Sequence, residues 1–161
     1  MRADYSAVRT MPGPAPTIGR LTSEARRLVD DARMSVVCSS FNFSKGSVMW
    51  DLLADASARP GVSVTIYLND RTGSATTVAA RLPRATVYRM AAKPGRRSRY
   101  VSHAKVIVID RATILMTSAN FSYSAENTNV ELGLLVHDTS LAESIESLMR
   151  SKHGVLYERV I

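Results

Sequence analysis

Apolar and polar residues recur along this chain with two periods, one typical of helices and one typical of strands. Residues 22–32 and 48–58 repeat apolar positions three and four apart, so that each segment has one apolar face. Residues 34–40 and 62–70 are short apolar runs bounded by turn-forming residues, and both are predicted strands. The first part of the chain is therefore predicted to alternate helix and strand.

Later in the chain, strand patterns follow one another without helices between them. The expected elements are a helix at 74–82, strands at 85–90, 103–109, 112–118 and 129–136, and a last helix from Asp138 or Ser140 to Met149. Alternating helices and strands followed by adjacent strands are typical of a mixed sheet with helices packed on it. Because 62–67 and 104–109 are apolar at nearly every position, helices are expected to cover both faces. The predicted fold class is α/β, a three-layer α/β/α sandwich.

The amino-terminal residues differ from the rest of the chain. Residues 1–20 include the run PGPAP, which cannot be helical and predicts a flexible, proline-rich lead-in. Residues 21–161 are expected to form a single domain. The lead-in lacks the apolar middle of a secretion signal, and no apolar stretch reaches the roughly 18 residues of a membrane helix. The chain is therefore expected to be cytoplasmic, without membrane insertion.

Composition adds an argument from charge. Lys and Arg outnumber Asp and Glu by 21 to 14, a net charge of +7. This balance favours a polyanionic partner such as nucleic acid or acidic lipid, without choosing between them. The single cysteine, Cys38, lies in an apolar run and is expected to be a buried hydrophobe. Phe41, Phe43 and Trp50 are assigned to core packing.

Polar residues enter the apolar strands near residue 103. His103 and Lys105 are two apart and therefore share one face of a strand. If residues 110–111 form a two-residue turn, the next strand places Ser118 directly across from His103. A longer turn would slide Ser118 toward Lys105. Either register gathers these polar groups at one end of the two strands.

Asn120, Asn129 and Glu131 are expected to bring two amides and a carboxylate to the same end. A neutral imidazole can attack phosphorus, and a carboxylate on its other nitrogen fixes the tautomer. Lys105 and Asn120 can neutralise and orient the non-bridging oxygens of a phosphate. Together these groups are what phosphoryl transfer requires.

The spacing of these residues resembles a known family. His103-Ala-Lys105, then four residues, then Asp110 matches the HxKxxxxD signature of the phospholipase D superfamily. The run TSANFS, with Ser118 and Asn120, is similar to the block that follows this signature. The run NVE, ending in Glu131, is similar to the acidic position after it. The resemblance covers roughly residues 21–150.

The resemblance implies a role for each matched residue. His103 would be the nucleophile that forms a phosphohistidine intermediate. Lys105 and Asn120 would bind the phosphate, with Ser118 assisting. Glu131 would orient His103. The family needs no metal or other cofactor for this chemistry, and no set of Asp, Glu, His or Cys residues in the sequence has ligand spacing.

The resemblance also implies a structural role for Asp110 and a homodimer. Members of the family usually need two such motifs, because a second histidine protonates the leaving oxygen. This chain has one copy, and neither His137 nor His153 is followed by the matching lysine. A two-fold dimer presents the same residue from both subunits and supplies the missing half. In this the chain resembles the small bacterial single-motif nucleases of the superfamily.

A basic loop precedes the motif directly. Its predicted substrate-contacting residues are Lys93, Arg96, Arg97, Arg99 and Tyr100. Arginines in this position can bind phosphates that flank the scissile one, and a tyrosine can stack on a base.

These observations predict a metal-independent phosphodiesterase that cleaves DNA or RNA at a site shared across a homodimer. One alternative is a phospholipid phosphodiesterase with the same chemistry. The small size, the basic loop and the lack of an amphipathic docking helix weigh against it. Another alternative is a nucleic-acid-binding subunit of a larger defence or repair complex with weak activity. The sequence does not choose between DNA and RNA.

Overall fold

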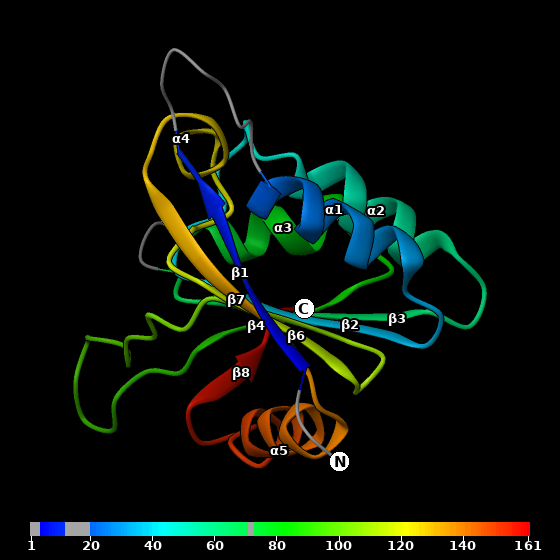
Figure 1. Ribbon diagram of the computed structural model, residues 1–161. Coiled ribbons are helices and arrows are strands. Elements are labelled where there is room, and N and C mark those ends of the chain that lie inside the picture. The colour runs from blue at the N-terminus through cyan, green and yellow to red at the C-terminus, as the bar shows by residue number, and fades with distance from the viewer. Residues whose placement is uncertain (1–3, 12–19, 71–72) are drawn as a thin grey trace.

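The computed structural model describes residues 4–11, 20–70 and 73–161 (Figure 1). Its strands are β1 (Asp4–Thr10), β2 (Ser35–Ser40), β3 (Ser63–Leu68), β4 (Thr86–Met90), β5 (Val106–Ile109), β6 (Thr113–Thr117), β7 (Glu131–His137) and β8 (Tyr157–Arg159). Its helices are α1 (Arg20–Asp31), α2 (Met49–Ala58), α3 (Ser74–Arg81), α4 (Tyr123–Asn127) and α5 (Thr139–Arg150).

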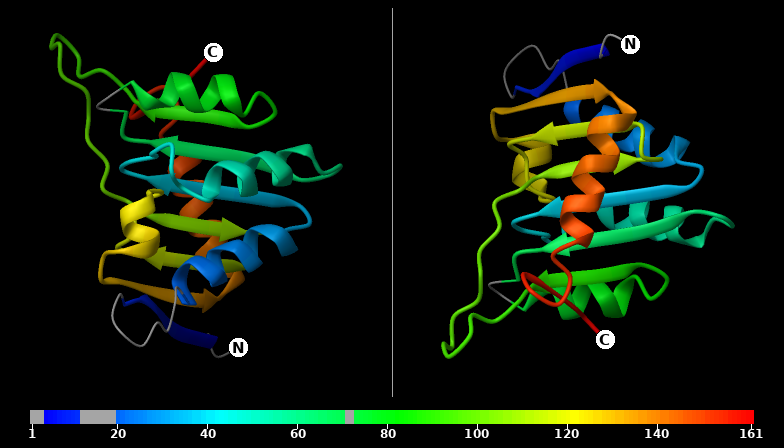
Figure 2. Two further views of the ribbon diagram at one scale, coloured as in Figure 1. Left: turned by 90° about the horizontal axis from the view of Figure 1, so that it is seen from above. Right: turned by 90° about the horizontal axis from the view of Figure 1, so that it is seen from below.

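The eight strands form one mixed sheet in the order β1-β7-β6-β5-β2-β3-β4-β8. Strands β2, β3 and β4 are parallel to one another, and β5, β6 and β7 run as an antiparallel meander beside β2. Helices α1, α2 and α3 cover one face of the sheet, and α5 crosses the other (Figures 1 and 2). The predicted α/β/α arrangement is confirmed.

The central strands bury both of their faces, which explains their continuous apolar runs. On β5, Ile107 and Ile109 pack in the core beneath α1 and α2, whereas Val106 and Val108 pack in a second core on the α5 side. Cys38 on β2 is fully buried, and this burial raises the pKa of its thiol. The thiol therefore behaves as the buried hydrophobe that the sequence predicted.

The amino-terminal residues differ from the flexible lead-in predicted for 1–20. Asp4–Thr10 form β1, which pairs antiparallel with β7 along its whole length. Val8 and Thr10 are buried, whereas Arg9 and the first four residues of the strand are exposed, so only its last part alternates between core and surface. The edge of β7 offers unpaired backbone N–H and C=O groups, and pairing with them makes residues 4–10 a strand. The pattern of this short, weakly apolar segment does not by itself predict that pairing. The proline-rich run lies outside the described residues.

Besides β1, two short elements were not predicted. α4 spans only five residues and β8 only three, too few for a periodic pattern to appear. The other helices and strands lie within three residues of their predicted ends.

Candidate active site

The ends of four neighbouring strands, β2, β5, β6 and β7, bring the predicted polar residues to one edge of the sheet. Because β5 runs antiparallel to β2, its first residue, Val106, pairs with Ser39 near the carboxyl end of β2. Val106 also pairs with Met116, and Thr117 pairs with Gly133. The residues before β5, after β6 and at the start of β7 therefore meet at the same edge. Figure 2 shows the long loop that precedes β5 extending from this edge.

Side chains from two neighbouring strands fix the backbone of the His103–Lys105 segment. The Ser39 hydroxyl donates to the carbonyl oxygen of Ala104 at 3.1 Å. The Asn69 Oδ1 atom accepts a hydrogen bond from the Ser102 N–H, also at 3.1 Å. On the other side, the Thr117 N–H donates to the carbonyl oxygen of Lys105 at 3.1 Å. The His103–Lys105 segment is thus held by β2, by β6 and by the residue that follows β3, although the segment itself precedes β5.

His103 is exposed, and its ring stacks on Phe41. The ring centroids are 4.5 Å apart and the planes differ by 12°. Phe41 follows β2 and was assigned to core packing, but it is only partly buried here. Lys105 is half-buried, and its ammonium donates to the carbonyl oxygen of His103 at 3.1 Å. An imidazole and an ammonium are therefore adjacent at the edge of the sheet, with a ring supporting the imidazole.

Glu131 lies nearly buried at the start of β7, beside Ser118. Its carboxylate accepts hydrogen bonds from the Ser118 hydroxyl and, at 3.1 Å, from the Asn129 side-chain amide. Ser118 is itself fixed, because its N–H donates to Leu132 O at 2.9 Å and its hydroxyl accepts from the Leu132 N–H at 3.1 Å. Among the hydrogen bonds of the described residues, none joins Glu131 to His103. That predicted contact stays a prediction.

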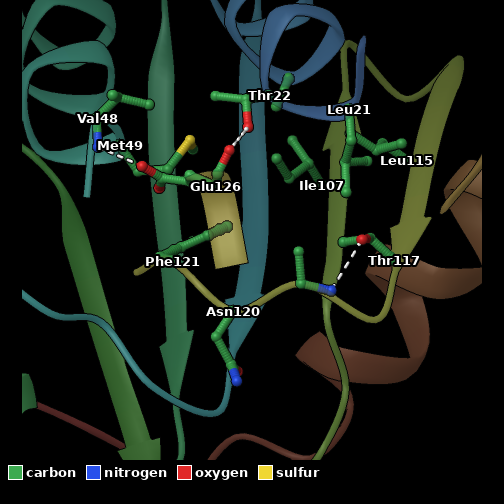
Figure 3. A pocket seen from close by; sticks show the side chains of 12 residues that line it. Leu21, Thr22, Val48, Met49, Ile107, Leu115, Thr117, Asn120, Phe121 and Glu126 are labelled. Carbon is green, nitrogen blue, oxygen red and sulfur yellow. Dashed lines mark hydrogen bonds between the residues drawn. The ribbon is translucent and has the colours of Figure 1, made fainter. Parts of the chain in front are cut away.

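Asn120 lies beyond β6, where its Oδ1 atom accepts a hydrogen bond from the Asn42 N–H at 3.3 Å. Its side chain points away from a small cavity of about 30 Å³ that lies above the sheet (Figure 3). Leu21, Ile107 and Phe121 line this cavity, so it belongs to the apolar core. Asn120 itself is half-buried at the sheet edge.

Sequence reasoning missed Glu126, a buried carboxylate on α4. It accepts hydrogen bonds from the Ser47 hydroxyl and from the Val48 N–H, the latter at 3.0 Å. Its carbonyl oxygen also accepts from the Thr22 hydroxyl at 3.3 Å (Figure 3). Burial raises the pKa of this carboxyl, although the Ser47 and Val48 donors oppose the shift. Glu126 ties the segment that follows Asn120 to α1 and to the start of α2.

The β5–β6 hairpin has the longer of the two predicted turns. Ile109 pairs with Thr113, which leaves residues 110–112 between the strands. Asp110 and Arg111 both have left-handed backbones, with φ of 52° and 55°. The two-residue turn was therefore wrong, and Ser118 is shifted from His103 toward Lys105. The Ala112 N–H donates to Ile109 O at 3.0 Å and closes the reversal, so Ala112 is the additional residue of the turn.

Asp110 joins this turn to the segment between α1 and β2. Its carboxylate accepts backbone N–H hydrogen bonds from Arg33, Met34 and Ser35, each at 2.8 Å. Burial acts to raise the pKa of the Asp110 carboxyl, but the three N–H donors outweigh it and lower the pKa. Asp110 thus connects the motif-bearing hairpin to the start of its partner strand.

Replacing Asp110 by alanine is expected to lower the free energy of unfolding by roughly 2–4 kcal/mol, because three backbone donors lose a charged acceptor. The carboxyl has a lowered pKa in the folded chain, so its contribution is present above its unfolded pKa and is lost as pH falls through the folded value. Urea titrations of the wild type and of Asp110→Asn, which keeps one side-chain acceptor, should converge in acid. Equal stability of Asp110→Ala and wild type at pH 7 would contradict this role.

The comparisons with known proteins decide the family. A family model described as "Cardiolipin synthase, PLD-like domain" matches residues 26–152. The chain belongs to the phospholipase D superfamily. A protein of Rickettsia bellii named phospholipase D is 34% identical over 119 residues, which are 72% of this chain and 55% of that protein. The chain therefore spans about half the length of this curated relative.

Solved structures of the superfamily share the fold of the chain. The phospholipase D family member Nuc from Salmonella typhimurium matches with a TM-score of 0.76 and 20% identity, over 99% of each chain. NucT from Helicobacter pylori matches with a TM-score of 0.72 and 20% identity, over 93% of this chain and 95% of that one. At this identity the likeness supports the fold alone.

The basic loop of this phospholipase D-like chain is a hairpin whose cations differ in their contacts. The Tyr100 N–H donates to Ala91 O at 3.0 Å and closes the loop. Arg99 donates to Glu158 at 2.6 Å and to Met90 O at 2.9 Å, so its guanidinium holds the loop to β4 and β8.

The other cations of the loop are more open. The Lys93 ammonium lies 5.7 Å from the centroid of the Tyr100 ring. Arg96 and Arg97 are exposed, and neither forms an ion pair with any described residue. Arg99 is thus a structural residue of the loop, while Arg96 and Arg97 present their charges to solvent.

The two remaining histidines contact other residues than His103. His137 ends β7 at the opposite edge, where its Nδ1 atom is 3.0 Å from the Thr113 hydroxyl. His153 lies on the α5 side, 2.8 Å from the Tyr67 hydroxyl, and stacks on Tyr88 with centroids 4.0 Å apart. Among the described residues, neither has a hydrogen bond or a ring contact with His103.

Two features are absent from the part of the chain that the structure describes. No helix among them is both long and apolar enough to cross a bilayer. No three His, Cys, Asp or Glu side chains among them gather as a metal site would require.

Proposed function

We propose that this phospholipase D-like chain is a metal-independent phosphodiesterase that cleaves nucleic acid through a phosphohistidine at His103. The observation that carries the proposal is the exposed imidazole of His103 beside the Lys105 ammonium, on a backbone that β2, β6 and the residue after β3 hold in place. A fixed, accessible nucleophile next to a fixed cation is the arrangement that attack on a phosphodiester requires.

The reaction has two displacements at phosphorus. A ring nitrogen of His103 attacks the phosphorus, the P–O bond to the leaving oxygen breaks, and a general acid protonates that oxygen. Water then attacks the phosphohistidine, releases the phosphomonoester and restores the imidazole. Lys105 and Asn120 are proposed to bind the non-bridging oxygens throughout, with Ser118 assisting. Glu131, held by Ser118 and Asn129, is proposed to orient His103 when substrate is bound.

Nucleic acid is the proposed substrate because positively charged side chains lie on the loop that precedes His103. Arg96 and Arg97 face solvent on the loop that leads into the motif. Closely spaced phosphates attract such a loop strongly, since binding releases condensed counterions. Phospholipid is the second candidate, because the curated relative is named phospholipase D.

Assays of both substrate classes with and without chelator test the proposal. The wild type is expected to cleave a labelled oligonucleotide at the same rate with and without excess EDTA, because no step uses a metal ion. Headgroup release from phosphatidylcholine and phosphatidylglycerol vesicles should stay at background. Loss of oligonucleotide cleavage in EDTA would refute the mechanism, and headgroup release without nucleic-acid cleavage would establish the lipid alternative.

A homodimer is proposed to supply the general acid. The chain has three histidines, and among the described residues neither His137 nor His153 has a hydrogen bond or a ring contact with His103. A two-fold axis beside His103 would bring in the same imidazole from a second copy, protonated where the first is neutral. One imidazole then acts as the nucleophile, and the imidazole of the second copy acts as the general acid.

An exposed apolar surface beside the site supports this dimer. Met116 on β6 pairs directly with Leu134 on β7, and their side chains are 48% and 41% exposed. Leu132, on the same face of β7, is 59% exposed. These three residues form the β6–β7 apolar surface, which lies on the α5 side of the sheet near Glu131. Exposed apolar side chains gathered in this way are typical of a protein–protein interface.

A further inference from the structure

A second cavity lies beside the motif, between the carboxyl end of β3 and the basic loop. Its volume is about 540 Å³, and it is lined by Asn69, Asp70, Arg97, Ser98, Arg99, Tyr100 and Val101. Val101 is two residues before His103, so at most about 7 Å of chain separates the cavity wall from the nucleophile. A polymer bound at His103 therefore has its neighbouring unit close to this cavity.

The floor of the cavity is polar and rigid. Asn69 is 1% exposed, and the hydrogen bond from the Ser102 N–H fixes its amide. Asp70 is 7% exposed; its carboxylate accepts from the Ala75 N–H at 2.8 Å and lies 3.8 Å from the Arg89 guanidinium. A floor of amide and carboxylate suits hydroxyl and base N–H groups, and it is unfavourable for an acyl chain.

The walls of the cavity include the guanidinium of Arg97 and the ring of Tyr100. Arg99 is held by Glu158 and Met90 O, so its guanidinium is committed to the loop. Arg97 lines the same cavity, is exposed, and forms no ion pair with a described residue. Tyr100 is half-buried and also lines the cavity. Of the two arginines in the wall, only Arg97 is available for a phosphate.

We propose that this cavity is a nucleotide subsite that receives the unit next to the scissile phosphate, and that Arg97 pairs with the phosphate of that unit. The inference rests on the proposed function, which it extends by naming a residue that selects a polymeric substrate. A volume of about 540 Å³ lies within the usual range of small-molecule sites and accommodates a nucleoside. The polar floor and the adjacent free cation favour a nucleotide over a lipid.

Arg97→Ala tests the subsite with two substrates that share one chemistry. Bis(p-nitrophenyl) phosphate contains a single phosphodiester and no neighbouring phosphate, whereas a short single-stranded oligonucleotide fills the subsite. The ratio of kcat/KM on the oligonucleotide to kcat/KM on bis(p-nitrophenyl) phosphate is expected to fall about tenfold or more in Arg97→Ala. Arg97→Lys should recover part of the ratio, because it restores the charge without the bidentate fork.

Arg33→Ala is the matched control, because it removes one exposed positive charge from the opposite edge of the sheet. Its substrate ratio should equal that of the wild type. An unchanged ratio in Arg97→Ala, or an equal fall in Arg33→Ala, would overturn the subsite.

A binding measurement separates the subsite from the chemistry. Fluorescence anisotropy with the labelled oligonucleotide should show weaker binding by Arg97→Ala than by Arg33→Ala, and a shallower dependence on salt. If the wild type cleaves neither substrate, the proposed function fails, while this measurement still decides the subsite. Equal affinities of the two variants, or wild-type binding to phosphatidylglycerol vesicles and not to the oligonucleotide, would overturn it.

Discussion

Replacing His103 by asparagine is expected to lower the rate of phosphodiester cleavage by about 10⁴-fold or more, because the reaction loses its nucleophile. Binding of nucleic acid should remain, since asparagine keeps a polar side chain and the basic loop is unchanged. The fold should also remain, because His103 is exposed and its ring contacts only Phe41 among the aromatic residues. The measurements are single-turnover cleavage and anisotropy with one labelled oligonucleotide.

His137→Asn is the matched control, since it removes an exposed imidazole from the opposite edge of the sheet. It should cleave at the wild-type rate. A substrate labelled at phosphorus, quenched in alkali during turnover, should leave label on the wild type and none on His103→Asn. If His103→Asn retained more than about a tenth of the wild-type rate, His103 would not be the nucleophile.

Replacing Leu134 by glutamate is expected to convert the proposed dimer into a monomer and to lower cleavage by about 10²–10⁴-fold. The substitution places a charge at the centre of the β6–β7 apolar surface, where burial against a second copy would require its desolvation. The rate then falls because His103 loses the general acid from its partner. Sedimentation velocity at micromolar concentration and single-turnover cleavage measure the two effects on one preparation.

Val155→Glu is the control for this substitution, because Val155 is 63% exposed and lies in the turn after α5. It should leave both the mass and the rate unchanged. A second test mixes wild type with an excess of His103→Asn. If the site is shared, mixed dimers lack one imidazole, and cleavage should fall well below that of the wild type alone. Undiminished cleavage after subunit exchange, or full activity of a monomeric Leu134→Glu, would argue for a site complete within one chain.

The three arginines of the basic loop show a distinction that sequence reasoning could not make. The sequence predicted one set of substrate contacts in this loop, namely Lys93, Arg96, Arg97, Arg99 and Tyr100. A run of cations before the motif does not show which of them bind substrate and which are paired within the protein. The structure separates them, since Arg99 is bound to Glu158, far away along the chain. Which cation is free depends on an acidic partner that no local pattern identifies.

Phe41 shows the same limit of sequence reasoning, for a residue that was assigned to the core. An aromatic residue after an apolar strand is typical of core packing, and Phe43, two residues later, is indeed 4% exposed. Phe41 instead stacks on His103, because β5 runs back beside the end of β2. The contact depends on the order of strands in the sheet, which the pattern of a single strand does not contain.

The sequence by itself determined the longer helices and strands, the covered central strands and the chemical groups near residue 103. It could do so because periodicity reports which faces are buried, and because His103 and Lys105 are neighbours along one strand. Only the tertiary structure decided the place of β1, the three-residue turn after β5, the anchoring of the motif by Ser39 and Asn69, and the buried Glu126 on α4. Each of these depends on contacts between segments far apart in the chain, whose energies appear only when the sheet is assembled.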